Sequence, residues 1–252
     1  MRICITAPFR AGSQSATRPL SLALLAAILL TASPLHAQDT EAEWEAAWEE
    51  AEEREREHQR LLEKARNVNE GDLVFLETRP DPGGPRMEKR IDLDASSLEN
   101  GWARMSQCHY NLDAVAAAEV VYNPQRTRNI QVTRAEDINE AVVDGPSVQL
   151  RDVGRDATLC VRAEVLAIVP NPEGDGYLVE NGPFMRRFLD GYYPMQVRLE
   201  VHWPPGLLRL SRSEPAPQPG HDLETDAGMV TVSAHFEGRL RSRLYLERPD
   251  EP

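Results

Sequence analysis

The sequence lacks the short motifs that mark the common catalytic and nucleotide-binding sites. It contains no G-x-S-x-G nucleophile elbow, no H-E-x-x-H zinc motif, no phosphate-binding P-loop and no G-x-G-x-x-G dinucleotide fingerprint. Its many carboxylates are not spaced in a way that selects one acid–base pair. We therefore predict no catalytic residue and no cofactor, and an enzyme with an unrecognised site is kept only as an alternative.

Positive charge is also scarce. The chain has 28 basic and 41 acidic side chains, which gives a formal net charge of −13. Binding to nucleic acid or to an anionic membrane surface requires clusters of Lys and Arg that replace condensed counterions. We therefore expect neither of these two partners.

No apolar run is long enough to cross a bilayer, which takes roughly 20 residues. The run Leu20–Leu30 follows three arginines and precedes Pro34 and Ala37, in the order of an export signal that is cleaved before Gln38. An uncleaved anchor is the rival interpretation, and the short run disfavours it. We predict a signal peptide over residues 1–37, a periplasmic or secreted location, and no membrane span after cleavage.

Cysteine is rare. The chain has three cysteines, and removal of the leader leaves Cys108 and Cys160. An oxidising compartment favours a disulfide between them. The closed loop of about fifty residues would add at most roughly 4 kcal/mol of stability. A haem or metal site at Cys108 and His109 is the weaker alternative, because Met105 stands where a Cys-x-x-Cys-His motif has its first cysteine.

Glycine and proline are absent from residues 41–66. Glutamates fill the first half of this stretch and basic residues fill the second half, which complements a helix dipole. Four of the charges have helical i, i+4 spacing, in the pairs Glu50–Arg54 and Glu52–Arg56. Trp44 and Trp48 share one face, but that face is too thin for a core helix. We predict a charged helical segment over residues 38–70 that is a solvated spacer; docking of the two tryptophans is the alternative.

From about Met105 onward, apolar residues recur at every second position. The clearest run contains Met195, Val197, Leu199, Val201 and Trp203. Shorter runs place Cys108, Tyr110 and Leu112 on one strand face, and Leu159, Val161 and Ala163 on another. Half-buried strands with one wet face require antiparallel pairing. We therefore predict a mainly β fold, an antiparallel β-sandwich over residues 71–252, preceded by one charged N-terminal α-helix.

The alternation is compatible with an immunoglobulin-like sandwich, and an up-and-down barrel is the alternative architecture. Two features differ from antibody domains. Thr158 stands two residues before Cys160, where a tyrosine corner has Tyr, and no Trp follows Cys108 at a suitable distance. Cys160 also shares its strand face with Arg162 and Glu164. We therefore do not expect its disulfide to be a central staple between two sheets.

The segment 182–194 concentrates aromatic and arginine side chains between a Gly-Pro and a Tyr-Pro turn. Tyr, Phe and Arg are the residue types that anchor protein interfaces. The candidate partner-binding residues are Phe184, Arg186, Arg187, Asp190, Tyr192 and Tyr193. The alternative is that the segment closes one end of the sandwich with its rings buried.

Two histidines suggest an alternative function. His202 and His235 fall on the outward faces of two expected strands and could meet if these strands pair. Two histidines at cross-strand spacing can bind copper or zinc, with Met229 or His221 nearby. An exposed histidine on a sheet is more often only solvated, so we predict no metal ligand and keep a periplasmic metal-handling protein as the alternative.

Together these patterns indicate an exported, non-catalytic binding or accessory module of the cell envelope. We expect it to act through protein–protein contacts with another envelope protein. No residue pattern in the sequence specifies an oligomeric state.

Overall fold

The structure is a computed structural model that describes residues 2–4, 45–46, 48–50, 52–57, 59, 69–78, 80–188 and 191–249. The chain divides into two compact units. One consists of Met1–Ala7 with Asn69–Pro252, and the other of Pro8–Val68. The described residues of the larger unit form sixteen strands and one short helix.

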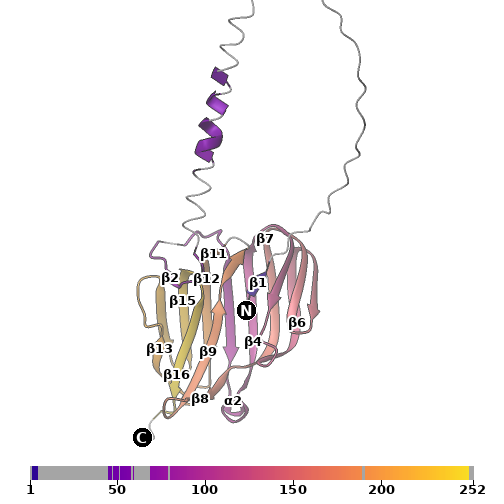
Figure 1. Cartoon of the computed structure of the whole chain (residues 1–252). Coiled ribbons are helices and arrows are strands. Elements are labelled where there is room, and N and C mark those ends of the chain that lie inside the picture. Colours follow the sequence, from indigo (N-terminus) through magenta and orange to yellow (C-terminus); the bar gives the residue numbers. More distant parts are fainter. Residues whose placement is uncertain are drawn as a thin grey trace, which may run out of the picture. The chain divides into compact units, whose positions relative to one another are not determined.

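Ten of these strands form one sheet, sheet A (Figure 1). Its hydrogen-bonded path runs through β1 (Arg2–Cys4), β5 (Val115–Val121), β7 (Ser147–Leu166), β4 (Trp102–Leu112), β3 (Arg86–Asp92), β12 (Met195–His202), β15 (Met229–Glu237) and β14 (His221–Asp226). Two further strands pair beside this path, β2 (Val74–Phe75) with β15 and β6 (Thr127–Asp144) with β7. Every pair is antiparallel except β3 with β12.

A second sheet, sheet C, has four strands, in the order β13 (Arg209–Glu214), β16 (Leu240–Glu247), β9 (Tyr177–Phe184) and β8 (Ile168–Pro170). A separate hairpin pairs β10 (Arg186–Phe188) with β11 (Gly191–Tyr193). The helix α2 (Ala95–Asn100) precedes β4. It begins at Asp94, whose side chain accepts a hydrogen bond from the backbone N–H of Ser97, and it ends at Gly101, which has a positive φ of 79°.

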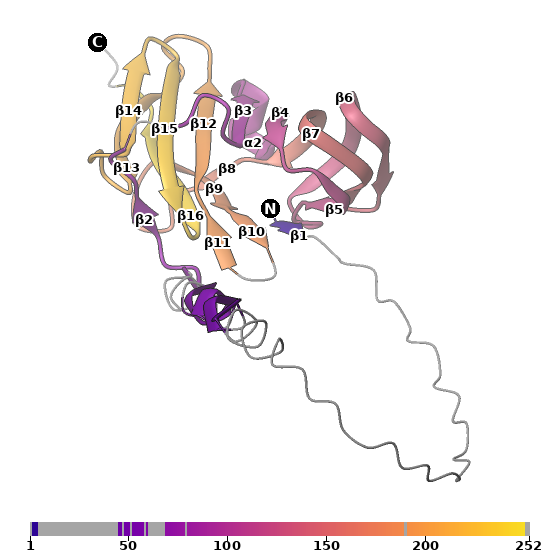
Figure 2. The ribbon, with the colours of Figure 1, turned by 90° about the horizontal axis from the view of Figure 1, so that it is seen from above.

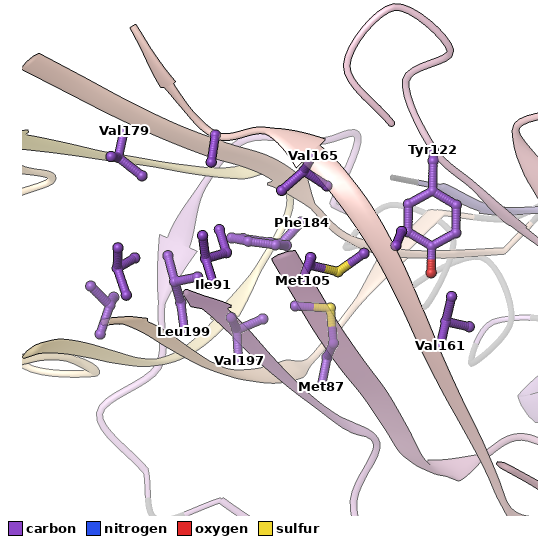
Figure 3. Packing of buried hydrophobic residues seen from close by; sticks show 14 of the residues in the cluster. Met87, Ile91, Met105, Tyr122, Val161, Val165, Val179, Phe184, Val197 and Leu199 are labelled. Atoms are coloured by element: carbon purple, nitrogen blue, oxygen red, sulfur yellow. The ribbon is translucent and has the colours of Figure 1, made fainter. Parts of the chain in front are cut away.

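Apolar side chains from sheets A and C pack into one core (Figure 3). Figure 2 shows β16 and β9 lying across β15 and β12, so this half of the molecule is a two-layered sandwich. The run from Met195 to Trp203 alternates as expected, with all five of its apolar side chains buried. The predicted mainly β, antiparallel fold is therefore confirmed.

Strand β7 organises the other half of sheet A. One hydrogen-bonding edge of β7 pairs with β5 along its first half and with β4 along its second half. The other edge pairs with β6 along nearly the whole strand. Gly154 lies between the two halves, where a Cβ would approach the carbonyl oxygen of Asp137 to 3.1 Å. The absence of a side chain there lets β6 cross β7 closely, and β4 to β7 curl around their own part of the core (Figure 2).

The core-facing side of β4 differs from the sequence prediction. Gln107 and His109 point into the core, whereas Cys108 and Tyr110 lie on the outer face. A register shift between His109 and Leu112 interrupts the two-residue period, so that Leu112 also packs against the core. The prediction counted back from Leu112 in steps of two and so placed Tyr110 and Cys108 on the same face. It was wrong because the register shift lies between Leu112 and these residues.

The disulfide between Cys108 and Cys160 is confirmed. The two residues lie directly opposite each other on β4 and β7, within one sheet. As expected, the disulfide does not join two sheets. It fixes the pairing of β7 with β4, the strand that carries Gln107 and His109 into the core.

In the smaller unit, residues 45–46, 48–50, 52–57 and 59 are helical. Both expected ion pairs form, with N···O distances of 3.6 Å for Arg54–Glu50 and 3.4 Å for Arg56–Glu52. The side chain of Trp48 is 66% exposed, while Trp44 lies outside the described residues. In the part of the chain that the structure describes, no helix combines the length and the hydrophobicity that a membrane span requires.

Candidate functional site

The predicted contact segment forms the end of β9 and the β10–β11 hairpin. Arg186 lies opposite Tyr193, and Arg187 lies opposite Tyr192. Because strand residues alternate, Arg186, Phe188 and Tyr193 share one face of the hairpin. The rings of Phe188 and Tyr193 meet edge to face with centroids 5.2 Å apart, a favourable arrangement for aromatic pairs.

Arg186 fastens the hairpin to sheet A. Its Nε and Nη2 donate hydrogen bonds of 3.0 and 2.6 Å to the carboxylate of Asp113, in the turn between β4 and β5. The exposed fractions of the two side chains are 18% and 37%, and a two-pronged pair of this kind is among the stronger charged contacts. The guanidinium also lies 5.1 and 5.5 Å from the ring centroids of Phe188 and Tyr193. Arg186 therefore positions the hairpin.

The other candidate residues are distributed between surface and core. Arg187 is exposed, and its guanidinium lies 5.6 Å from the ring centroid of the half-buried Tyr192. Tyr193 is also half-buried. The ring of Phe184 is buried in the core, where it is not available to a partner. Asp190 lies outside the described residues.

A short strand from the chain's own N-terminus lies between this hairpin and β5 (Figure 2). Within the leader predicted over residues 1–37, Arg2–Cys4 are the described residues, and they form β1. In the antiparallel register, Arg2 lies opposite Val121 and Cys4 opposite Glu119. Since β5 pairs with β7 on its other side, β1 occupies the second hydrogen-bonding edge of β5.

A narrow apolar cavity of about 30 Å³ lies beside this edge. Its walls include Leu112, Ala118, Val120, Leu150, Phe188 and Met195, from β4, β5, β7, β10 and β12. The cavity shows that the hairpin and the curled half of sheet A do not fill the space between them completely. An apolar side chain of a bound segment would find a matching lining there.

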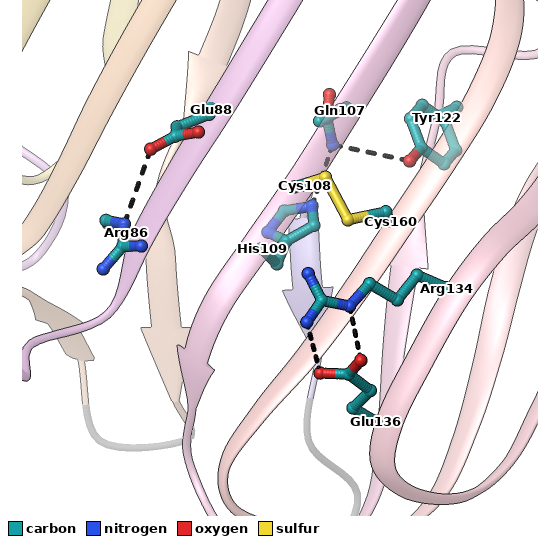
Figure 4. Close-up of a disulfide and its surroundings, with 9 residues drawn as sticks. All are labelled: Arg86, Glu88, Gln107, Cys108, His109, Tyr122, Arg134, Glu136 and Cys160. Carbon is teal, nitrogen blue, oxygen red and sulfur yellow. Dashed lines mark hydrogen bonds and ion pairs between the residues drawn. A yellow bond between two sulfur atoms is a disulfide. The ribbon is translucent and has the colours of Figure 1, made fainter.

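A buried polar cluster lies on the inner face of β4, and sequence reasoning missed it (Figure 4). The side-chain nitrogen of Gln107 lies 2.8 Å from Nε2 of His109 and donates a 3.4 Å hydrogen bond to the hydroxyl of Tyr122. Gln107 and His109 are only 2% and 1% exposed. Burial lowers the pKa of His109 to about 4, so its ring is neutral and Nε2 accepts a hydrogen bond from the amide of Gln107. Counting in steps of two from Met105 would have placed both side chains inward.

The two histidines of the metal alternative do not meet. The register of β12 with β15 puts His202 opposite Met229 and His235 opposite Gln196, at the two ends of the pair. His202 instead lies 3.1 Å from a carboxylate oxygen of Glu200. Among the described residues, no group of three or more His, Cys, Asp and Glu side chains is placed to hold a metal ion. The expectation that strand pairing would join these two histidines was wrong.

Comparisons with known proteins add no functional inference. No protein-family model and no curated protein matches the chain, so its function has to be argued from its own residues.

Proposed function

We propose that the chain is an exported, non-catalytic binding module of the cell envelope that acts through protein–protein contacts. Its contact surface is the β10–β11 hairpin together with the outer edge of β5. The partner presents an extended segment that adds to β5 as an antiparallel strand. The observation that carries this proposal is β1, a segment of the chain's own N-terminus that is paired there.

In this proposal β1 covers the edge of β5 only until the leader is cleaved. Cleavage after Ala37 would remove Arg2–Cys4 and leave the outer N–H and C=O groups of β5 without a partner strand. Such an edge is a ready template for strand addition, a recurring mode of peptide recognition. The disulfide between Cys108 and Cys160 supports an oxidising compartment. The leader would thus cover the binding edge until the protein has been exported.

The sequence of β5 suits strand addition better than that of the other long edge. β5 reads Val-Ala-Ala-Ala-Glu-Val-Val, with one charged residue in seven. β6, which pairs only with β7 among the described strands, carries exposed charges at Arg128, Arg134, Glu136, Asp137 and Glu140. Charged side chains along an edge discourage pairing with another chain. β6 is therefore protected against the contact that β5 permits.

The hairpin indicates the chemistry of the partner. The exposed Arg187 has no carboxylate partner among the described residues, and the ring of Tyr192 lies beside it. Arginine and tyrosine are enriched where interfaces gain most of their binding energy. The expected partner segment combines alternating apolar residues, for the edge and cavity, with an acidic residue that reaches Arg187.

Photo-crosslinking in the envelope tests this surface. A photoactivatable amino acid in place of Val121 or Arg187 should link to one and the same protein, and the same group in place of Arg248, just beyond β16, should not. In a binding assay with that protein purified, Arg187→Glu should weaken the affinity by about tenfold, or 1.4 kcal/mol. Arg248→Glu is the matched control and should bind like the unaltered chain.

Two results would count against the proposal. The first is cross-linking from position 248 as strong as that from positions 121 and 187. The second is an equal affinity for the Arg187→Glu and Arg248→Glu variants. Mass analysis of the recovered protein checks the export step separately, since the chain should begin at Gln38.

A further inference from the structure

Lysine is nearly absent from this protein, and one of its two lysines faces the core. The chain has 28 basic residues, of which only Lys64 and Lys89 are lysines. Lys89 shares the inward face of β3 with the buried Met87 and Ile91, and it lies directly opposite Gln107 on β4. The half-buried Lys89 therefore lies beside the buried polar cluster described above.

The amine of Lys89 has no hydrogen-bond acceptor and no ion-pair partner among the described residues; the aromatic contact is with Phe184, whose ring centroid lies 5.9 Å from Nζ. Removal from water, and secondarily the positive charge of Arg126, lowers the pKa of Lys89 to about 8. At neutral pH the amine is therefore mostly charged and lacks a counter-charge. Arginine would stay charged in such a place, whereas lysine responds to its surroundings.

A cavity of about 90 Å³ adjoins this amine. It has room for a few water molecules or for one small anion. Besides Lys89, the polar side chains around it are Gln107, Tyr122, Asn123, Arg126, Thr127, Glu180 and Asn181. Most of these groups can donate hydrogen bonds, so the lining suits an acceptor.

Asn181 supplies an independent sign of a missing ligand. It lies on β9, is only 5% exposed and lines the cavity, and its Nδ2 has no hydrogen-bond acceptor among the described residues. A buried donor without an acceptor is rare because its desolvation is not compensated. An anion in the cavity would bring hydrogen-bond acceptors to the residues that line it, Asn181 and Lys89 among them.

We infer that this cavity binds a small carboxylate anion, which is held by the Lys89 amine and the Asn181 amide. The other charged groups around the cavity favour a single negative charge. Arg126 donates hydrogen bonds of 3.2 and 2.9 Å to the carbonyl of Leu166 and lies 3.9 Å from Glu180, whose own negative charge would repel a dianion. Hydrogen bonding from Arg243 lowers the pKa of Glu180, and burial raises that of Tyr122, so Glu180 stays ionised and Tyr122 remains a donor at neutral pH.

Nuclear magnetic resonance of the full chain labelled with ¹³C-lysine tests the inference directly. Two lysines give two Cε signals, and Lys89→Arg identifies the signal of Lys89. In sodium chloride the signal should titrate near pH 8. In sodium acetate at equal ionic strength the midpoint should rise by about one unit or more, because the anion stabilises the charged amine. If the midpoint in sodium acetate equals the midpoint in sodium chloride, the inference is overturned.

Calorimetric titration with acetate provides a second, independent readout. Lys89→Met should weaken acetate binding by about tenfold or more, whereas Lys64→Met should bind like the unaltered chain. Binding to the unaltered chain should fall above pH 8, and Lys89→Arg should retain it there because a guanidinium stays charged. Equal binding by Lys89→Met, or loss of binding at the same pH in Lys89→Arg and the unaltered chain, contradicts the inference.

Discussion

Polar side chains occupy several core-facing strand positions, where apolar residues are expected. Lys89, Gln107 and His109 face the core from β3 and β4, and Asn181 faces it from β9. Burial of such groups costs stability unless they are fully hydrogen-bonded. Natural sequences mostly depart from local consistency in this way at functional sites. These core-facing polar residues make the inner face of β4 the part of the fold that apolar packing alone does not explain.

His109 should make the protein sensitive to acid. Its pKa is about 4 in the fold and about 6.5 when exposed, so the unfolded chain binds more protons between these values. The free energy of unfolding should fall by up to about 3 kcal/mol as the pH is lowered from 6.5 to 4. Urea unfolding across this range should show a smaller decrease for His109→Gln. Identical pH profiles for the two proteins would rule out a neutral, buried His109.

Lys89 should give a pH dependence of the same sign as His109, with stability that rises with pH, but on the alkaline side. Its pKa is lowered from 10.5 to about 8, so the fold is penalised as long as the amine is charged. Lys89→Met should raise the free energy of unfolding by up to about 3 kcal/mol at pH 7. The gain should shrink between pH 8 and 10.5, because the amine has lost its proton in the folded state but still holds it in the unfolded state. Denaturation at several pH values measures this difference, and a gain that stays constant with pH would contradict the assigned environment.

At the scale of elements, predictability depended on the regularity of each strand. The alternation in β12 could be read from the sequence because the strand is straight and its apolar positions are buried without interruption. Which side chains of β4 face the core could not be read from the sequence, because a register shift after His109 interrupts the alternation. The β10–β11 hairpin follows β9 directly, and its three-residue strands are too short for a period-two signal.

The hairpin should loosen when its attachment to Asp113 is weakened. Asp113→Asn removes the charge that accepts two hydrogen bonds from Arg186. We expect a loss of about 1–2 kcal/mol in stability and faster amide hydrogen exchange in residues 186–193. Glu173→Gln is the control, since it alters an ion pair with Arg212 whose side chains are 47% and 61% exposed. It should change stability by less than about 1 kcal/mol, and equal effects of both variants would refute the special role of Asp113.

At the scale of the whole molecule, the class of the fold and the disulfide were predicted from the sequence and are confirmed, while the hairpin residues of the contact surface stay a prediction. The disulfide followed from a cysteine count and the expected compartment. The pairing of β1 with β5 could not be predicted, because three residues within the predicted leader carry no strand signal of their own. The cavity beside Lys89 could not be predicted either, since β3, β4, β6, β7 and β9 meet there only after folding.

The disulfide should contribute measurably to the stability of the whole fold. Replacing both Cys108 and Cys160 by Ser opens a loop with a sequence separation of 52 residues. We expect the free energy of unfolding to fall by about 2–4 kcal/mol, with the β-rich circular dichroism spectrum retained below the melting temperature. Reduction of the unaltered chain should have the same effect. An unchanged melting temperature after either treatment would show that the β4–β7 pairing does not need the covalent link.

Hydrogen exchange at the outer edge of β5 tests the central claim most directly. It should be measured in the full chain, in the protein recovered from the envelope, and in that protein bound to its cross-linked partner. The amides of Glu119–Val121 that do not pair with β7 should be protected in the full chain, exchange at least about tenfold faster after export, and be protected again in the complex. Equal exchange rates in all three samples would contradict the proposal that β5 accepts a partner strand.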